Sequence, residues 1–172
     1  MLAINQARGR NMKMMTGLGI LAGLALGGGA ADATTTTSNF GVTMAITAQC
    51  VINSTATLTL SSVGVIQANN DASTPIHIQC TNTTPYTIGL DPGTTSGATV
   101  SQRLLANGAA TVNYNLYSDT GRTTVWGNTG GALVNSTGNG ADQTFTVYGR
   151  VPAQTTPAPG TYTDTITVTV TY

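Results

Sequence analysis

Alternation of apolar and polar residues is the main pattern of this chain after residue 33. Residues 162–172 show it most clearly, because one parity is apolar and β-branched side chains fill most positions. Shorter alternating runs occur at residues 40–46, 58–60, 76–78, 86–90, 112–117 and 145–151. No stretch after residue 33 has the spacing of an amphipathic helix, so the pattern predicts an all-β domain.

Turn sequences separate these runs at short intervals, among them Asn69-Asn70-Asp71, Asp91-Pro92-Gly93, Asn107-Gly108, Asp119-Thr120-Gly121, Asn139-Gly140 and Pro159-Gly160. The Gly/Ser/Asn-rich residues 127–142 predict a long surface loop around one short strand at 132–134. Short strands with one polar face require a second sheet to cover their apolar face. The expected fold is therefore a β-sandwich.

The first 33 residues have the order of a secretory signal peptide. Three cations precede the uncharged stretch 14–31, and Ala31-Asp32-Ala33 predicts cleavage near Ala33; the cations are Arg8, Arg10 and Lys13. A membrane anchor is the alternative, since the stretch approaches the length of about 18 residues that spans a bilayer. Its many glycines, and the lack of a basic cluster after it, favour a signal peptide at 1–33 and export through the periplasm.

Export leaves 139 of the 172 residues, which suits one domain. Residues 34–172 hold five aspartates and three arginines, with neither Lys nor Glu, so their formal charge is −2. Nucleic acid is excluded as an expected partner, because phosphate binding needs clustered cations. Thr, Gly, Asn and Ser supply the polar surface, as in extracellular β proteins.

Two cysteines remain after residue 33, Cys50 and Cys80. Because exported proteins mature in an oxidising compartment, we expect them to form one disulfide. On a chain-entropy estimate, closing this loop stabilises the fold by about 3–4 kcal/mol. The alternative is a pair of buried thiols. No His/Cys cluster or CxxC pair indicates a metal site.

The sequence offers little for catalysis. His77 is the single histidine, and it lies on the parity opposite to Ile76 and Ile78, which is typical of a surface or interface residue. The five aspartates are dispersed, and no nucleophile elbow, phosphate loop or calcium loop is present. We therefore expect a protein that is not an enzyme and that holds no metal or cofactor.

An ordered set of short motifs carries a family resemblance. The set is Cys50, Cys80, Pro85-Tyr86, Leu90-Asp91-Pro92-Gly93, Arg103-Leu104, Tyr114-Asn115-Leu116-Tyr117-Ser118-Asp119, Val125-Trp126-Gly127, Val147-Tyr148-Gly149-Arg150-Val151-Pro152-Ala153-Gln154 and Pro159-Gly160-Thr161-Tyr162-Thr163-Asp164-Thr165. In this order the motifs resemble the spore coat protein U domain, over nearly all of residues 40–172. That family includes subunits of archaic, Csu-type chaperone-usher pili.

The resemblance implies an immunoglobulin-like sandwich that lacks its last strand. In such pili a periplasmic chaperone fills the open groove first, and the N-terminal strand of the next subunit replaces it at an outer-membrane usher. The donor segment would be residues 34–48, followed by the pilin domain at 49–172. The residues that would fill the groove are Phe40, Val42, Met44 and Ile46. The alternative is an ordinary first strand packed in its own domain.

The resemblance also implies a binding role for the C-terminal end of the chain. The family's C-terminal strand borders the groove and is held by the chaperone, which maps onto Ile166, Val168, Val170 and Tyr172. An open strand edge of this kind needs a partner to cover it. The alternative is a complete sandwich that ends on its final strand.

Three functions follow from these expectations. The leading one is a pilus subunit that assembles with other subunits at the cell surface and acts in adhesion and biofilm formation. The second is a secreted coat or matrix protein of the same family without usher-driven assembly. The third is a small extracellular binding module or enzyme, which predicts a stable monomer.

Overall fold

The computed structural model describes residues 32–172. The signal peptide predicted at 1–33 lies almost entirely outside the described residues and stays a prediction. Residues Thr43–Tyr172 form one unit, and residues 32–42 belong to a separate unit without helix or strand among its described residues. In the part of the chain that the structure covers, no helix is long and apolar enough to cross a membrane.

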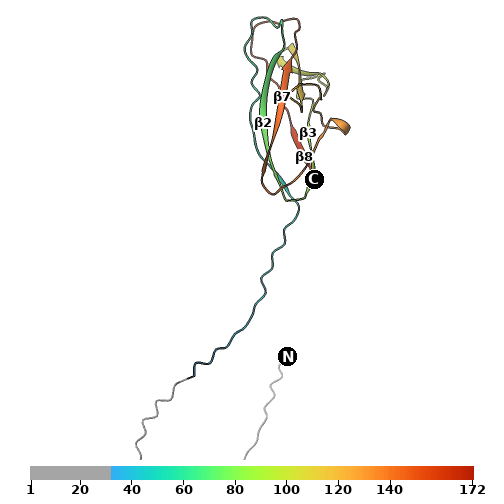
Figure 1. The fold of residues 1–172 in the computed structure, drawn as a ribbon. Coiled ribbons are helices and arrows are strands. Elements are labelled where there is room, and N and C mark those ends of the chain that lie inside the picture. Colours follow the sequence, from blue (N-terminus) through green and yellow to red (C-terminus); the bar gives the residue numbers. More distant parts are fainter. Residues whose placement is uncertain (1–31) are drawn as a thin grey trace, which may run out of the picture. The chain divides into compact units, whose positions relative to one another are not determined.

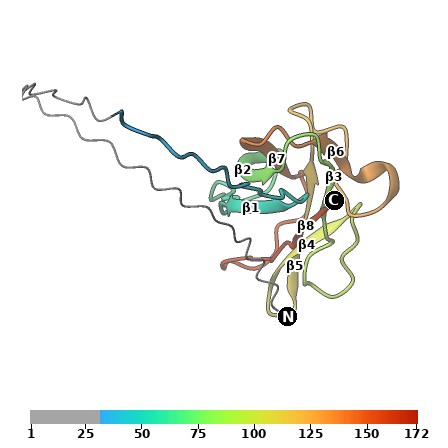
Figure 2. The ribbon, with the colours of Figure 1, turned by 90° about the horizontal axis from the view of Figure 1, so that it is seen from below.

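Two antiparallel sheets make up the domain between Thr43 and Tyr172. The first has the strand order β1-β2-β7-β5-β4, and its strands are Cys50–Thr55 (β1), Asn70–Cys80 (β2), Asp142–Val151 (β7), Ala110–Tyr117 (β5) and Arg103–Asn107 (β4). The second has the order β6-β3-β8, with Val134–Thr137 (β6), Pro85–Leu90 (β3) and Val168–Thr171 (β8). Figures 1 and 2 show the two layers, with β2 and β7 in one and β3 and β8 in the other. The all-β sandwich predicted from the alternation is confirmed.

The core lies between the sheets and is built from the apolar parity of the central strands. Its fully buried side chains come from both layers: Ile76, Ile78, Tyr86, Ile88, Leu90, Val112, Tyr114, Leu116, Val147 and Val151. Trp126, the one tryptophan of the sequence, is also buried, and its indole N–H donates to the Ile88 carbonyl at 3.0 Å. Alternation therefore identified most of the core correctly.

A disulfide joins the first two strands. Cys50 and Cys80 form the bond, and they are also directly paired in the register of β1 and β2. The predicted disulfide is confirmed, and it fixes the start of the domain to the end of β2.

Arg103, at the start of β4, is completely buried without a carboxylate partner. Its five N–H groups donate to five neutral oxygens, which are the carbonyls of Leu90, Asp91, Val100 and Trp126 and the Asn115 Oδ1, at 2.8–3.2 Å. Burial lowers the pKa of the guanidinium, because the charged form loses its hydration. Arg103 therefore holds together segments from both sheets by hydrogen bonds alone.

The structure corrects the strand boundaries in two places. The short strand predicted at 132–134 lies two residues further along the chain, as β6 at Val134–Thr137, and Ala132 instead ends a 3-10 turn at Gly130–Ala132. Residues 162–172 were predicted as one strand that contained Asp164, but only Val168–Thr171 is assigned to β8. The strand is interrupted because carboxylates take the place of backbone acceptors for the N–H groups of Thr165 and Thr167.

Replacing Arg103 by methionine is expected to cost more than about 3 kcal/mol in the free energy of unfolding, because several buried oxygens lose their donors at once. Urea unfolding followed by Trp126 fluorescence measures this effect. Arg150→Met is the matched control. Arg150 pairs with Asp71 on the surface at 2.8 Å, and losing such a pair costs up to about 1 kcal/mol. Equal losses for the two variants would contradict the bracing role of Arg103.

Candidate functional site

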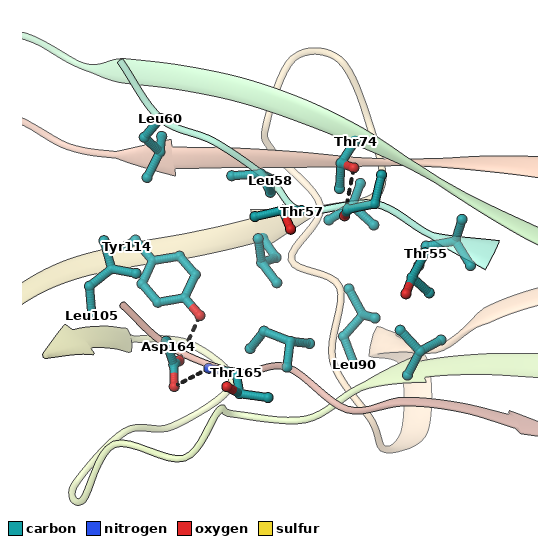
Figure 3. Close-up of a pocket in the computed structure, with 16 residues that line it drawn as sticks. Thr55, Thr57, Leu58, Leu60, Thr74, Leu90, Leu105, Tyr114, Asp164 and Thr165 are labelled. Atoms are coloured by element: carbon teal, nitrogen blue, oxygen red, sulfur yellow. Dashed lines mark hydrogen bonds between the residues drawn. The ribbon is translucent and has the colours of Figure 1, made fainter. Parts of the chain in front are cut away.

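An apolar groove of about 320 Å³ opens along the sandwich. Its lining is mostly aliphatic and comes from both sheets: Thr55, Ala56, Thr57, Leu58, Leu60, Thr74, Ile76, Leu90, Leu105, Tyr114, Leu116, Val147, Asp164, Thr165, Ile166 and Val168. Figure 3 shows Leu58 and Leu60 on one side, with Asp164 and Thr165 on the other. The groove therefore has two walls, residues 55–60 and residues 164–168.

Each wall continues a strand at the edge of its sheet. Residues 55–60 follow β1, which is the edge of the five-stranded sheet, and residues 164–168 lead into β8, which is the edge of the three-stranded sheet. The described residues place no strand between these two edges. The groove is therefore the position that one more strand would occupy.

The wall at residues 55–60 is held from behind by side chains of β2. The Thr74 hydroxyl donates to the Ala56 carbonyl at 2.9 Å, and the Asn70 amide bonds both backbone groups of Ser61 at 2.6 and 3.2 Å. Leu58 packs close to Gly149 of β7, where a Cβ atom would lie 2.8 Å from Leu58 Cδ1. Gly149 therefore leaves the room that this wall needs.

The opposite wall changes partners along its length. Thr163 makes two backbone hydrogen bonds with Ala106 of β4, at 2.9 and 3.0 Å, and residues 168–171 pair with β3. Between these points the Asp91 carboxylate accepts a hydrogen bond from the Thr167 N–H at 2.9 Å. The Asp164 carboxylate accepts one from the N–H of the next residue, Thr165, at 2.8 Å. The Thr167 carbonyl still accepts the Asp91 N–H at 3.2 Å. Carboxylates thus replace the backbone acceptors of the Thr165 and Thr167 N–H groups, which explains why the predicted strand is interrupted.

The backbone groups used in these bonds all belong to odd-numbered residues. They are Thr163, Thr165, Thr167, Thr169 and Thr171. Thr163 faces β4, Thr167 faces the turn after β3, and Thr169 and Thr171 face β3 itself. In an extended chain the backbone groups of successive residues point to opposite sides. The N–H and C=O groups of Asp164, Ile166, Val168 and Val170 therefore face the open side, where an additional strand would pair.

Asp164 is the one charged group in the groove lining. Its carboxylate accepts hydrogen bonds from four groups of the domain. They are the Tyr114 hydroxyl at 2.7 Å, the Thr94 N–H and hydroxyl at 2.9 and 3.1 Å, and the Thr165 N–H described above. Gly93 has a positive φ of 91°, and any Cβ there would collide with this carboxylate. Asp164 is thus bound within its own domain and fixes the start of the wall.

Tyr114 is buried beneath Asp164, with its hydroxyl directed at the carboxylate (Figure 3). Burial, and secondly the hydrogen bond to Asp164, raise the pKa of this phenol far above its usual value. The Tyr114 hydroxyl therefore stays protonated and donates to Asp164 across the physiological pH range.

Comparison with known proteins identifies the family of this chain. Residues 36–169 match the Spore Coat Protein U domain. The chain is 34% identical over 157 residues to "Protein U" of Myxococcus xanthus, over 83% of this chain and 88% of that protein. The chain belongs to the Spore Coat Protein U domain family. The resemblance predicted from the sequence is confirmed.

A solved structure shares the fold of this Spore Coat Protein U domain. It is a chaperone-tip adhesion subunit pre-assembly complex, CsuC-CsuE, from archaic chaperone-usher Csu pili of Acinetobacter baumannii. The TM-score is 0.56 at 19% sequence identity, and the match covers 74% of this chain. The match spans only 40% of the solved chain's length. At this identity the likeness shows the fold alone.

The side chains that were predicted to act as the donor strand are all exposed. Phe40, Val42, Met44 and Ile46 are 88%, 83%, 86% and 76% exposed, which is unusual for four large apolar residues at alternate positions. Residues 40–46 form no strand in the structure. The donor role of these residues and the alternative of a first strand packed in its own domain therefore both stay predictions.

The predicted C-terminal residues do not all lie in one place. Ile166 and Val168 line the groove, and Val170 continues their parity half-buried against the core. Tyr172 is 58% exposed and borders a different, shallow hollow with Tyr86, Asn135 and Thr171. Two residues of the predicted set therefore belong to the groove itself.

His77 was predicted to lie at the surface, and the structure places it half-buried on the outer face of β2. Its Nδ1 atom contacts Asp142 Oδ2 at 2.7 Å and Thr144 Oγ1 at 3.3 Å. A nucleophile-His-Asp triad needs the hydroxyl and the carboxylate on different ring nitrogens. Both contacts use the same nitrogen, so this cluster lacks the geometry of a triad. Across residues 32–172, no three His, Cys, Asp or Glu side chains gather into a group able to hold a metal ion.

Sequence reasoning missed the polar parts of the groove. Asp91 was assigned to a turn and Asp164 to a strand, and neither was linked to Tyr114. Leu58 and Leu60 were recognised as apolar parity but not as a wall. The Asp-Pro-Gly turn at 91–93 is the one local signal, because it marks a carboxylate beside a glycine that tolerates close approach.

Removing the Asp164 carboxylate is expected to destabilise the domain through Tyr114. We expect Asp164→Ala to cost about 2–3 kcal/mol in the free energy of unfolding, since the buried hydroxyl loses its acceptor. In combination with Tyr114→Phe, the loss should be smaller than the sum of the two single losses by about 1–2 kcal/mol. A double-mutant cycle in urea measures this coupling, and strict additivity would disprove the contact.

Alkaline pH gives a separate test of the same tyrosine. Because the folded-state pKa of Tyr114 is raised, its contribution to stability is complete below the unfolded pKa of about 10 and is lost as pH rises above it. The urea midpoint should therefore fall more steeply above pH 10 for the natural chain than for Tyr114→Phe. Parallel curves for the two proteins from pH 8 to pH 11 would show that Tyr114 is not the cause.

Proposed function

We propose that this chain is a structural subunit of a surface pilus, assembled by the chaperone-usher pathway through donor-strand exchange. The observation that carries the proposal is the apolar groove between two open sheet edges, in a chain that also exposes alternate apolar side chains at residues 40–46. Membership of the Spore Coat Protein U domain family and the fold shared with a pilus subunit support it.

The exposed segment has the apolar alternation that a strand filling the groove would need. A strand of seven residues spans about 20 Å, and its alternate side chains point to one face. Between the apolar positions stand Gly41, Thr43 and Ala45, which are small enough for the solvent face of an inserted strand. Main-chain hydrogen bonds to the open side of residues 164–170 would supply affinity, and the aliphatic lining would select the side chains.

The proposed partners follow from this mechanism. A periplasmic chaperone holds the C-terminal strand at Ile166, Val168, Val170 and Tyr172 and fills the groove first. At an outer-membrane usher, residues 34–48 of another subunit then replace the chaperone and complete the domain formed by residues 49–172. The product is an extracellular fibre, for which we propose a role in adhesion and biofilm formation.

A coat protein without usher-driven assembly is the second candidate. Similarity to Protein U over 88% of that protein's length favours it. The neighbouring genes discriminate between the two candidates, because pilus assembly requires a chaperone and an usher.

Charged residues at the donor positions are expected to abolish assembly. In Val42→Asp/Met44→Asp, each carboxylate would enter the apolar groove without a partner, which is strongly unfavourable. The full chain is exported to a bacterial periplasm, and polymers are detected as a ladder on denaturing gels without boiling. We expect the ladder to disappear and the Cys50–Cys80 disulfide to persist.

Thr43→Asp is the matched control. Combined with Ala45→Asp, it adds the same two charges to the same segment but on the opposite parity, so the ladder should remain. Deleting residues 34–48 should also remove the ladder. Polymers that persist after this deletion, or a stable monomer with these residues intact, would contradict donor-strand exchange.

A further inference from the structure

The exit of the N-terminal segment from the domain is fixed by one threonine. Thr81 directly follows Cys80, and its N–H donates to the Gln49 carbonyl at 2.9 Å. Its hydroxyl accepts the Gln49 N–H at 3.1 Å and lies 3.2 and 3.3 Å from the carbonyls of Gln49 and Thr47. Residues 47–49 therefore continue the line of β1 along the end of β2.

This exit lies at the wrong end of β1 for the chain's own groove. The groove begins at Thr55 and extends to Leu60, whereas the segment leaves the domain before Cys50. Ten residues of extended chain separate Cys50 from Leu60, which is about 33 Å. The disulfide prevents β1 from peeling away from β2 to shorten this path.

A tight hairpin would not solve the problem. If residues 47–49 formed the loop, Ile46 would lie opposite Cys50 and Phe40 opposite Ala56. The polar residues Thr36 and Ser38 would then face Leu60 and Leu58. Such a hairpin would also turn the chain at residues 47–49, which Thr81 holds in an extended line, and would leave Leu58 and Leu60 without apolar partners.

We propose that the three-residue connector Thr47–Gln49, clamped by Thr81, prevents the chain from filling its own groove, so that the strand that fills it comes from a second copy. This inference rests on the proposed donor-strand exchange and adds the element that directs it between molecules. Thr81 acts as a positioning residue, since it contacts the connector and not the groove.

Lengthening the connector tests the proposal directly. Inserting about 15 Gly/Ser residues between Ile46 and Thr47 provides more than the required span, and at the effective millimolar concentration of a short tether, intramolecular insertion should prevail. The full chain is exported to the periplasm and its mass is measured by light scattering. We expect the polymer to be replaced mainly by a folded monomer, and an undiminished polymer would overturn the inference.

Two further variants separate this inference from the proposed function. The insertion combined with Val42→Asp/Met44→Asp should give no protected monomer, because the donor itself is disabled. If the natural chain forms no polymer, or forms one that tolerates Val42→Asp/Met44→Asp, the proposed function fails. If the natural chain polymerises in the expected way and the insertion leaves the polymer unchanged, only the connector proposal fails.

Hydrogen exchange tests the role of Thr81. Thr81→Val keeps the shape and the backbone bond but removes the hydroxyl, so we expect exchange of the Gln49 amide to rise about fivefold, as for one lost hydrogen bond. Thr81→Ser should restore protection. Thr111→Val is the control, at an exposed strand position. Unchanged exchange in Thr81→Val would remove Thr81 from the mechanism.

Discussion

Both walls of the groove are held by side chains where a sheet would use its backbone, and the open position in the sandwich depends on this. Thr74 and Asn70 secure residues 55–61, and Asp91 and Asp164 secure residues 164–167. Side-chain partners occupy only the rear of each wall. They leave the backbone groups on the open side of each wall available to an additional strand.

Arg103 stabilises this arrangement from below. Its guanidinium binds the carbonyls of Leu90 and Asp91, while the Asp91 side chain holds Thr167 in the C-terminal wall. The same residue reaches Trp126 and Asn115, so the turn that shapes the groove is connected to both sheets. Burying the Arg103 charge costs free energy, and hydrogen bonds from all five of its N–H groups offset part of this cost. This link connects the Arg103 network to the C-terminal wall of the groove.

The parts of the fold that follow from local pattern were predictable from the sequence. Alternation identified β5, β7 and the buried parity of β2, and the two cysteines identified the disulfide. The interruption at residues 164–167 was not predictable, because its partners Asp91 and Tyr114 are distant in sequence and were assigned to a turn and a core strand. The bracing role of Arg103 was not predictable either, although Arg103 is part of a family motif, since its acceptors are four backbone carbonyls and one side-chain amide oxygen at five different positions. The groove is shaped by polar contacts between residues that are distant in the sequence.

The exposure of Phe40, Val42, Met44 and Ile46 links the stability of the domain to assembly. Burying such side chains is worth about 1.5–3 kcal/mol each. Together they approach the whole free energy of unfolding of a typical domain. On the proposed mechanism, an inserted strand covers these residues and the groove lining in one step, although part of the gain offsets the cost of association. On the same mechanism, the connector at Thr81 would deny this gain to the isolated chain, so the polymer would be the stable state and the subunit would need shielding until it reached the growing fibre.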